Sequence, residues 1–138
     1  MAKQLTIMVG LPRSGKSTYA KMTGHPIVAR DAVHHAMCGK QLQPLDDIQP
    51  MVSTFIKYMI TALFQAGHDK VIYDACNHTK EVRARWITWC LFNGIECKFK
   101  HIITPMGMCQ SRAKQFKNAD WLVPKIKEMY EEGDWIDD

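Results

Sequence analysis

Short apolar runs alternate with longer amphipathic segments along this chain. The apolar runs predict buried strands, which lie at 5–9, 27–29, 71–74 and 95–103. Segments with helical spacing of apolar positions lie between them, at 16–22, 31–38, 47–66, 79–93 and 106–117, and Pro124 stands at a possible first position of another helix. Repeated alternation of strand and helix is typical of α/β proteins, so we expect a parallel β-sheet flanked by helices.

Local signals mark the ends of several of these helices. Gly39 and Gly67 follow the last apolar positions of their segments, where a glycine commonly ends a helix. Thr79 precedes a helical segment and predicts an N-cap, because its hydroxyl can accept a hydrogen bond from an unpaired N–H of the first turn.

The segment 47–66 has the clearest amphipathic pattern. Its apolar positions follow the i, i+3, i+4, i+7 spacing of one helix face. They are Ile48, Met51, Val52, Phe55, Met59, Leu63 and Phe64. This face could form a seam with a second copy of the chain, but we expect it to pack in the core, because a layered fold needs helices with one apolar face.

The composition is that of one ordinary globular domain over residues 1–138, with 46% hydrophobic and 23% charged residues. The longest apolar run, 7–11, is too short to cross a membrane, and the N-terminus lacks the apolar region of a signal peptide. The five cysteines are odd in number and have no C-x-x-C spacing, which indicates reduced thiols in a cytoplasmic protein. The oligomeric state is left open.

The net charge of +4 hides an asymmetry between the body and the end of the chain. Residues 1–127 hold all 18 Lys and Arg but only eight of the 14 acidic residues, and the other six lie in the acidic tail, 128–138. A basic body suits an anionic ligand such as a nucleotide or nucleic acid. The tail could lie over a basic groove and compete with a nucleic acid, but we expect a solvated end.

One segment matches the phosphate-binding pattern G-x-x-x-x-G-K-[ST] at every fixed position. It consists of Gly10, Leu11, Pro12, Arg13, Ser14, Gly15, Lys16 and Ser17, with Thr18 next in the chain. A predicted strand precedes it and a predicted helix follows, so backbone N–H groups can point at phosphate oxygens where the helix begins. Lys16 is expected to reach the β- and γ-phosphates of ATP, and the Ser17 hydroxyl to ligate Mg²⁺.

Two acidic residues follow predicted strands and are candidates for chemistry. Asp74 ends the strand 71–74, where a carboxylate can hold Mg²⁺ or orient the acceptor, although it could also be a turn residue. Asp31 follows the strand 27–29 and could be the general base that accepts the proton of an attacking hydroxyl, or only a helix cap. Asn77 and His78, in the loop after Asp74, could contact substrate or belong to a plain loop.

A cationic helical stretch at 110–117 contains Arg112, Lys114 and Lys117. Kinases with this phosphate-binding loop commonly close a helix-and-loop lid, here at about 107–123, over the phosphates. Arg112 would there neutralise charge that grows during phosphoryl transfer. The alternative is a solvated basic helix face.

These motifs, taken together, resemble the kinase domain of phage-type 5′-polynucleotide kinases, a group within the P-loop kinases. The similarity extends over nearly the whole chain: the phosphate-binding loop, Arg30-Asp31, the run from Val71 to Asn77 and the Arg112 region come in the same order. The resemblance implies a P-loop kinase fold with a helical lid and ATP-dependent phosphorylation of a DNA or RNA 5′-hydroxyl. It also implies that Asp31 is the general base, that Asp74 orders the acceptor side and that Arg112 grips the phosphates.

Three departures from that family bear on the acceptor and the lid. Arg13 occupies a loop position that is usually glycine, and His34 stands where those kinases carry an arginine for the substrate phosphate. A second lid arginine has no match, since Phe116 and Lys117 lie near its place. A kinase for a small nucleoside or sugar, or a slow nucleotide-binding module, therefore stay open as alternatives.

Overall fold

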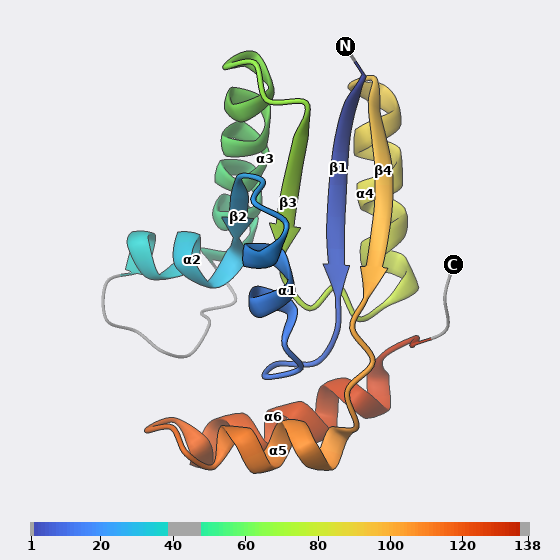
Figure 1. Ribbon diagram of the computed structural model, residues 1–138. Helices are drawn as coiled ribbons and strands as arrows, with labels where there is room; N and C mark the ends of the chain where they lie inside the picture. Colours follow the sequence, from blue (N-terminus) through green and yellow to red (C-terminus); the bar gives the residue numbers. More distant parts are fainter. Residues whose placement is uncertain (1, 39–47, 136–138) are drawn as a thin grey trace.

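The computed structural model describes residues 2–38 and 48–135. Its single sheet contains four parallel strands in the order β2-β3-β1-β4 (Figure 1). The strands are β1 (Lys3–Val9), β2 (Ile27–Ala29), β3 (Lys70–Asp74) and β4 (Ile95–His101). The parallel sheet flanked by helices that the sequence predicts is therefore confirmed.

Helices cover both faces of the sheet and one of its ends (Figure 1). They are α1 (Lys16–Met22), α2 (Arg30–Cys38), α3 (Gln49–Gln65), α4 (Lys80–Phe92), α5 (Met106–Ala113) and α6 (Ala119–Glu132). Helix α1 lies on one face, and α3 and α4 lie on the other. Helices α5 and α6 pack on each other beyond the ends of the strands, below the sheet in Figure 1.

The connections leave β1 and β3 in opposite directions across the sheet. From β1 the chain passes through α1 to β2, on the far side of β3, whereas from β3 it passes through α4 to β4, beyond β1. The ends of the neighbouring strands β1 and β3 are thus the switch point of the sheet, the place where ligands bind in open α/β sheets. Ala29 pairs with Asp74, so the end of β2 lies at the same edge.

The largest part of the core lies between the sheet and helices α3 and α4. Leu5 and Ile7 of β1 and Tyr73 of β3 are fully or almost fully buried there, and Tyr73 packs on Trp86 of α4 with ring centroids 4.6 Å apart. On the opposite face a smaller cluster joins Met8 to Ala20 of α1. Both faces of β1 and β3 are therefore covered, which gives the loops that follow these strands a rigid support.

Helix α3 packs in the core as expected, but the predicted face is partly wrong. Its buried side chains are Val52, Ile56, Ile60 and Phe64, which form one row with i, i+4 spacing. Met51, Phe55 and Met59, expected in the core, are 43 to 54% exposed. The helix has apolar residues on more than one side, so only the position of the sheet decides which row is buried.

Two helix boundaries also differ from the sequence-based expectation. Helix α5 ends at Ala113 rather than at Lys117, and α6 begins at Ala119, so Pro124 lies inside the helix instead of at its first position. The interior proline removes one backbone hydrogen bond. The apolar face of α6, with Leu122, Ile126 and Met129 buried against α5, offsets that loss.

Other expectations can be compared directly. Thr79 caps α4, and its side chain accepts a hydrogen bond of 3.2 Å from the Val82 N–H. The residues Gly39 and Asp47, where helix ends were predicted, lie outside the described residues. All five cysteines are free, and within 2–38 and 48–135 no helix is both long and apolar enough to cross a membrane.

Candidate phosphate-binding site

The phosphate-binding motif forms the turn between β1 and α1. Gly15 has φ 104° and Arg13 has φ 65°, so the loop turns through two left-handed residues before the helix starts at Lys16. Glycine adopts this conformation without strain, whereas Arg13 does not. The Ser14 N–H donates to the Leu11 carbonyl at 3.1 Å, and Thr104 Oγ1 donates to the Ser14 carbonyl at 2.7 Å, which ties the loop to the segment after β4.

The interior of this loop fits a tightly bound anion. A Cβ atom at Gly10 would come within 2.8 Å of Ser14 Oγ and 3.0 Å of the Ile102 carbonyl oxygen, so only glycine leaves the space free. Ser14 Oγ is buried and has no hydrogen-bond partner in the described part of the chain. A buried hydroxyl without a partner is costly, and a phosphate oxygen in the loop would relieve that cost.

The Lys16 side chain lies under the loop. Its Nζ donates a hydrogen bond of 2.7 Å to the Leu11 carbonyl, and the residue is only 8% exposed. In the described part of the chain no carboxylate forms an ion pair with this buried ammonium group, so it is available to an anion. Phosphate oxygens carry charge and are stronger acceptors than a peptide carbonyl, so Lys16 can transfer its hydrogen bonds to them.

Ser17 and Asp74, the two residues predicted to hold Mg²⁺, meet at the edge of the sheet. Ser17 Oγ donates a hydrogen bond of 2.7 Å to Asp74 Oδ2, across 57 residues of sequence. Asp74 is 9% exposed, and its position at the end of β3 places it beside the phosphate-binding loop. A hydroxyl and a carboxylate are oxygen ligands of the kind that Mg²⁺ uses together with phosphate and water.

Asp31 lies on the next strand connection, in the first turn of α2, and is exposed. Helix α2 already starts at Arg30, so Asp31 is inside the helix and is not its N-cap. Burial raises the pKa of Tyr73 and of Cys76, and in both cases the Asp31 carboxylate adds to the rise. Its charge therefore acts at the end of β3, on the side away from β1.

Arg30 holds this helix start in place. Its guanidinium donates to Gln49 Oε1 at 2.8 Å and to Ser53 Oγ at 3.2 Å on α3, and to the Tyr73 hydroxyl at 3.4 Å on β3. These bonds link α2, α3 and β3. The start of α2, which carries Asp31, is therefore tied to α3 and to the buried Tyr73.

Cys76 belongs to this site, although the sequence analysis did not single it out. Burial raises the pKa of its thiol, and Lys16 opposes that rise through its charge and a hydrogen bond. The charges of Lys16, Asp31 and Asp74 all act on this thiol, and the rise in its pKa favours the neutral form. Its place two residues after a strand-ending carboxylate was the signal that could have found it.

Asn77 and His34, both expected on the acceptor side, are buried and already have partners within the protein. Asn77 Nδ2 donates to the Met8 carbonyl at 2.8 Å, and its φ of 47° turns the chain sharply. His34 Nε2 lies 3.6 Å from the Cys38 sulfur on the same helix. Asn77 thus fastens the loop after β3 to β1, directly before the phosphate-binding loop.

The segment after α6 packs on the loop 77–80, and the expected solvated end is wrong for residues 133–135. The Asp134 N–H donates to the His78 carbonyl at 2.7 Å, and Asp134 Oδ2 accepts from the Lys80 N–H at 3.0 Å. His78 Nε2 lies 2.8 Å from Glu132 Oε1. The acidic residues Glu128, Glu131 and Glu132 lie within α6 itself, whereas Asp137 and Asp138 lie outside the described residues.

A fully buried arginine joins these two segments. Arg83 of α4 is 1% exposed and donates to the Asn77 carbonyl at 3.0 Å and to the Asp134 carbonyl at 2.9 Å. Through these bonds α4 supports the loop that follows Asp74. This role could not be predicted, because the contact of Arg83 with Asp134 spans 51 residues of the chain.

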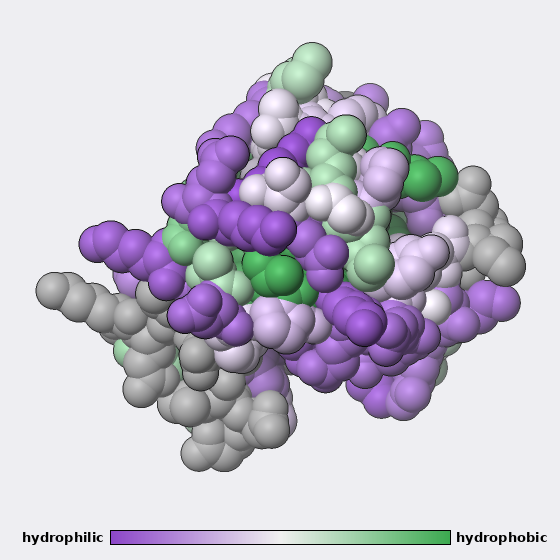
Figure 2. Space-filling view, turned by 90° about the horizontal axis from the view of Figure 1, so that it is seen from below, coloured by the Kyte–Doolittle hydropathy of each residue, from purple (hydrophilic) through white to green (hydrophobic). Residues whose placement is uncertain are grey.

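Helices α5 and α6 lie next to the phosphate-binding loop, and the segment 107–123, predicted as a lid, covers most of α5, the turn after it and the first part of α6. Leu11 is packed into the cluster between them, together with Cys109 and Ala113. Arg112 is exposed on α5, and its Nη1 donates to the Arg13 carbonyl at 3.0 Å. Figure 2 shows the molecule from this end, where hydrophilic residues surround a small hydrophobic patch.

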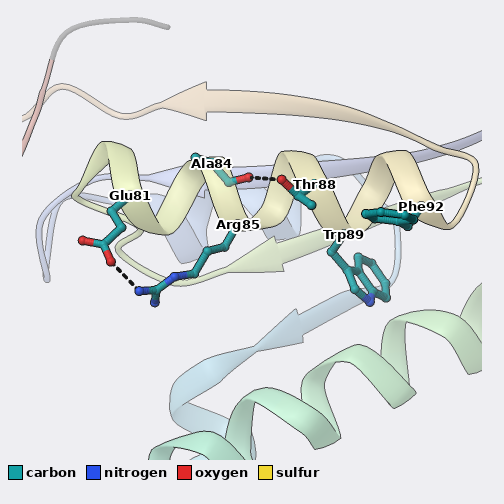
Figure 3. A pocket seen from close by; sticks show the side chains of 6 residues that line it. All are labelled: Glu81, Ala84, Arg85, Thr88, Trp89 and Phe92. Atoms are coloured by element: carbon teal, nitrogen blue, oxygen red, sulfur yellow. Dashed lines mark hydrogen bonds and ion pairs between the residues drawn. The ribbon is translucent and has the colours of Figure 1, made fainter.

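A separate hollow of about 490 Å³ lies along α4 (Figure 3). Its lining is mostly apolar and includes Trp89 and Phe92, with the Glu81–Arg85 ion pair at one end. None of its described lining residues comes from the phosphate-binding loop or from the ends of β2 and β3. It is therefore distinct from the site where the candidate chemistry gathers.

Comparison with known protein families shows to which family this chain belongs. A family model described as an AAA domain (AAA_33) matches residues 5–123, which include the phosphate-binding loop, both candidate carboxylates and Arg112. The chain belongs to this family. None of the curated proteins matches this AAA domain.

Solved structures share the P-loop kinase fold at low sequence identity. One is the Pnkp1/Rnl/Hen1 RNA repair complex, at TM-score 0.65 and 19% identity over 97% of this chain and 47% of the other. A protein of Chloroflexus aurantiacus provisionally assigned as a kinase has TM-score 0.69 and 15% identity, over 99% and 83% of the two chains. The Mycobacterium tuberculosis APS kinase CysC, in complex with AMPPNP and APS, has TM-score 0.60 and 15% identity, over 95% and 99%. This domain spans about half the length of the chain it matches in the RNA repair complex.

Proposed function

We propose that this AAA domain is a kinase that transfers the γ-phosphate of ATP to the 5′-hydroxyl of a DNA or RNA end. One observation carries the proposal: the Ser17–Asp74 hydrogen bond of 2.7 Å joins the phosphate-binding loop to the end of β3, where the charge of Asp31 also acts. A donor phosphate in the loop would thus have a carboxylate on its acceptor side. That is the arrangement that phosphoryl transfer needs, because it depends on positioning and charge neutralisation.

The donor side consists of the loop and the lid. Backbone N–H groups of Arg13 and of residues 15–18 would bind the phosphates. Lys16 would turn from the Leu11 carbonyl to the β- and γ-phosphates, and Arg112 would add a second positive charge. Ser17 and Asp74 would hold Mg²⁺, which neutralises phosphate charge when it is bound.

The acceptor side begins at Asp31. An exposed carboxylate at the start of α2 can accept a hydrogen bond from the attacking hydroxyl and take its proton as the bond to phosphorus forms. Asp74 would also help to orient that hydroxyl. His34 and Asn77 would support the acceptor side without contacting the acceptor directly, since both side chains are buried and have partners within the protein.

Two observations favour a polynucleotide as the acceptor. The residues before the tail carry a large excess of positive charge, which attracts a polyanion. One structural neighbour is a chain of the Pnkp1/Rnl/Hen1 RNA repair complex. A second candidate is a kinase for a small acceptor, which the similarity to an APS kinase over nearly the whole of both chains favours.

Transfer of label from γ-labelled ATP to a set of acceptors tests the proposal. We expect label on an oligonucleotide with a free 5′-hydroxyl and none on the same oligonucleotide with a 5′-phosphate. Label on a nucleoside, a sugar or a sulfonucleotide instead would support the small-acceptor kinase. Nucleotide binding without label on any acceptor would indicate a binding module and contradict the proposal.

A further inference from the structure

Arg13 has an unfavourable backbone conformation in a loop that otherwise uses glycine for such turns. Its φ of 65° lies in the left-handed region, which costs free energy for any residue with a Cβ atom. A glycine at this position would avoid that cost. Contacts made by this residue must therefore offset the strain, and they point to what the arginine does.

Both the side chain and the backbone of Arg13 contact the lid. The guanidinium carbon lies 3.5 Å from the centroid of the Phe116 ring, in the turn between α5 and α6. The carbonyl oxygen accepts the hydrogen bond of 3.0 Å from Arg112 Nη1. The first contact spans 103 residues of sequence and the second spans 99, so one loop residue fastens two points of the lid.

The turn that carries Phe116 is itself well defined. The Phe116 N–H donates to the Ala113 carbonyl at 3.1 Å, and the Ala119 N–H donates to the Phe116 carbonyl at 3.1 Å. The ring nevertheless stays 44% exposed, so its packing against the rest of the lid is incomplete. Its one described ring partner is the Arg13 guanidinium, which makes the pair a contact between the loop and the lid rather than part of the core.

We propose that Arg13 is a positioning residue: it latches the α5–α6 lid to the phosphate-binding loop and so keeps the Arg112 guanidinium beside the phosphates. The effect on catalysis rests on the proposed kinase function, but the latch itself does not. Stacking of guanidinium on the ring sets the distance between lid and loop, and the hydrogen bond to the Arg13 carbonyl sets the direction of Arg112.

A double-mutant cycle tests the latch. Arg13→Ala and Phe116→Ala should each lower kcat/KM for ATP by roughly 3- to 30-fold, the range that a cation–π contact of ordinary strength allows. The double variant should lose no more than the stronger single variant, because both substitutions remove the same contact. Lys114→Ala, an exposed residue of the same lid, is the matched control and should keep the wild-type value.

Hydrogen exchange in the protein without nucleotide gives a readout that needs no activity. Backbone amides of 106–118 should exchange several-fold faster in Arg13→Ala and in Phe116→Ala than in the wild type or in Lys114→Ala. Arg13→Gly should show the same faster exchange with an unchanged or higher Tm, because glycine removes the backbone strain. Faster exchange in a protein without kinase activity would support the latch and contradict only the proposed function.

Two results would overturn the proposal. Losses that multiply in the double variant would mean that Arg13 and Phe116 act separately, as they would if Arg13 bound phosphate directly. Unchanged exchange in 106–118 on removal of either side chain would mean that their contact does not hold the lid.

Discussion

Replacement of the buried arginine of α4 should have a large effect on stability. Arg83→Met keeps an apolar side chain of similar length but leaves the carbonyls of Asn77 and Asp134 without the donor that each has at about 3 Å. A hydrogen bond to a charged group contributes about 1.5–3 kcal/mol, so the loss of two should cost about 3–6 kcal/mol of the free energy of unfolding. That is a large fraction of the free energy of unfolding of a typical domain, which is roughly 5–15 kcal/mol.

Thermal unfolding followed by circular dichroism measures the effect. For a domain of this length we expect Tm to fall by about 10 °C or more. The matched control is Arg85→Met, two residues along the same helix, since Arg85 is exposed and pairs only with Glu81 among its described partners. An exposed pair of this kind contributes about 1 kcal/mol or less. Equal Tm values for the two variants would refute the view that Arg83 holds the loop after β3.

Three further predictions concern the site and its surroundings. Lys16→Ala should raise the barrier to phosphoryl transfer by about 3–4 kcal/mol and so nearly abolish turnover in a protein that still folds. Wild-type turnover of the folded variant would contradict the role of the loop. Asp134→Ala should lower the free energy of unfolding by about 0.5–2 kcal/mol in a denaturant titration, because it removes the acceptor for the Lys80 N–H, and an unchanged midpoint would show that this contact is not needed. Affinity for an oligonucleotide should fall with salt at a log–log slope of about −0.7 per phosphate contact, whereas a flat response in a filter-binding assay would favour a small acceptor.

The sequence predicted the parts of this molecule that depend on local signals. The strands are short apolar runs, the phosphate-binding loop has fixed residue types at fixed spacing, and Asp74 ends its strand. Each of these signals lies within a stretch of about ten residues. The parallel sheet then brings the ends of β1, β2 and β3 together without further information. That is why Ser17 and Asp74, 57 residues apart, were expected at one site and are found in contact.

Features that depend on distant contacts could not be predicted. The row of α3 that faces the sheet depends on where the sheet lies, and the start of α6 before Pro124 depends on packing against α5. The same holds for Arg83 and for the stacking of Arg13 on Phe116, since each side chain finds its partner more than fifty residues away in the chain. Local propensity carries no information on such pairs.

The proposed function requires that a donor phosphate in the loop and an acceptor hydroxyl at Asp31 meet at one sheet edge. Single-turnover transfer from γ-labelled ATP to a 5′-hydroxyl oligonucleotide by Asp31→Asn, with ATP affinity measured on the same protein, tests this requirement. Asparagine keeps the size of the side chain but cannot take the proton, so the rate should fall by about 10²- to 10⁴-fold while the Kd for ATP stays at its wild-type value. Equal losses in rate and in ATP affinity, or a rate unchanged from the wild type, would contradict the proposed function.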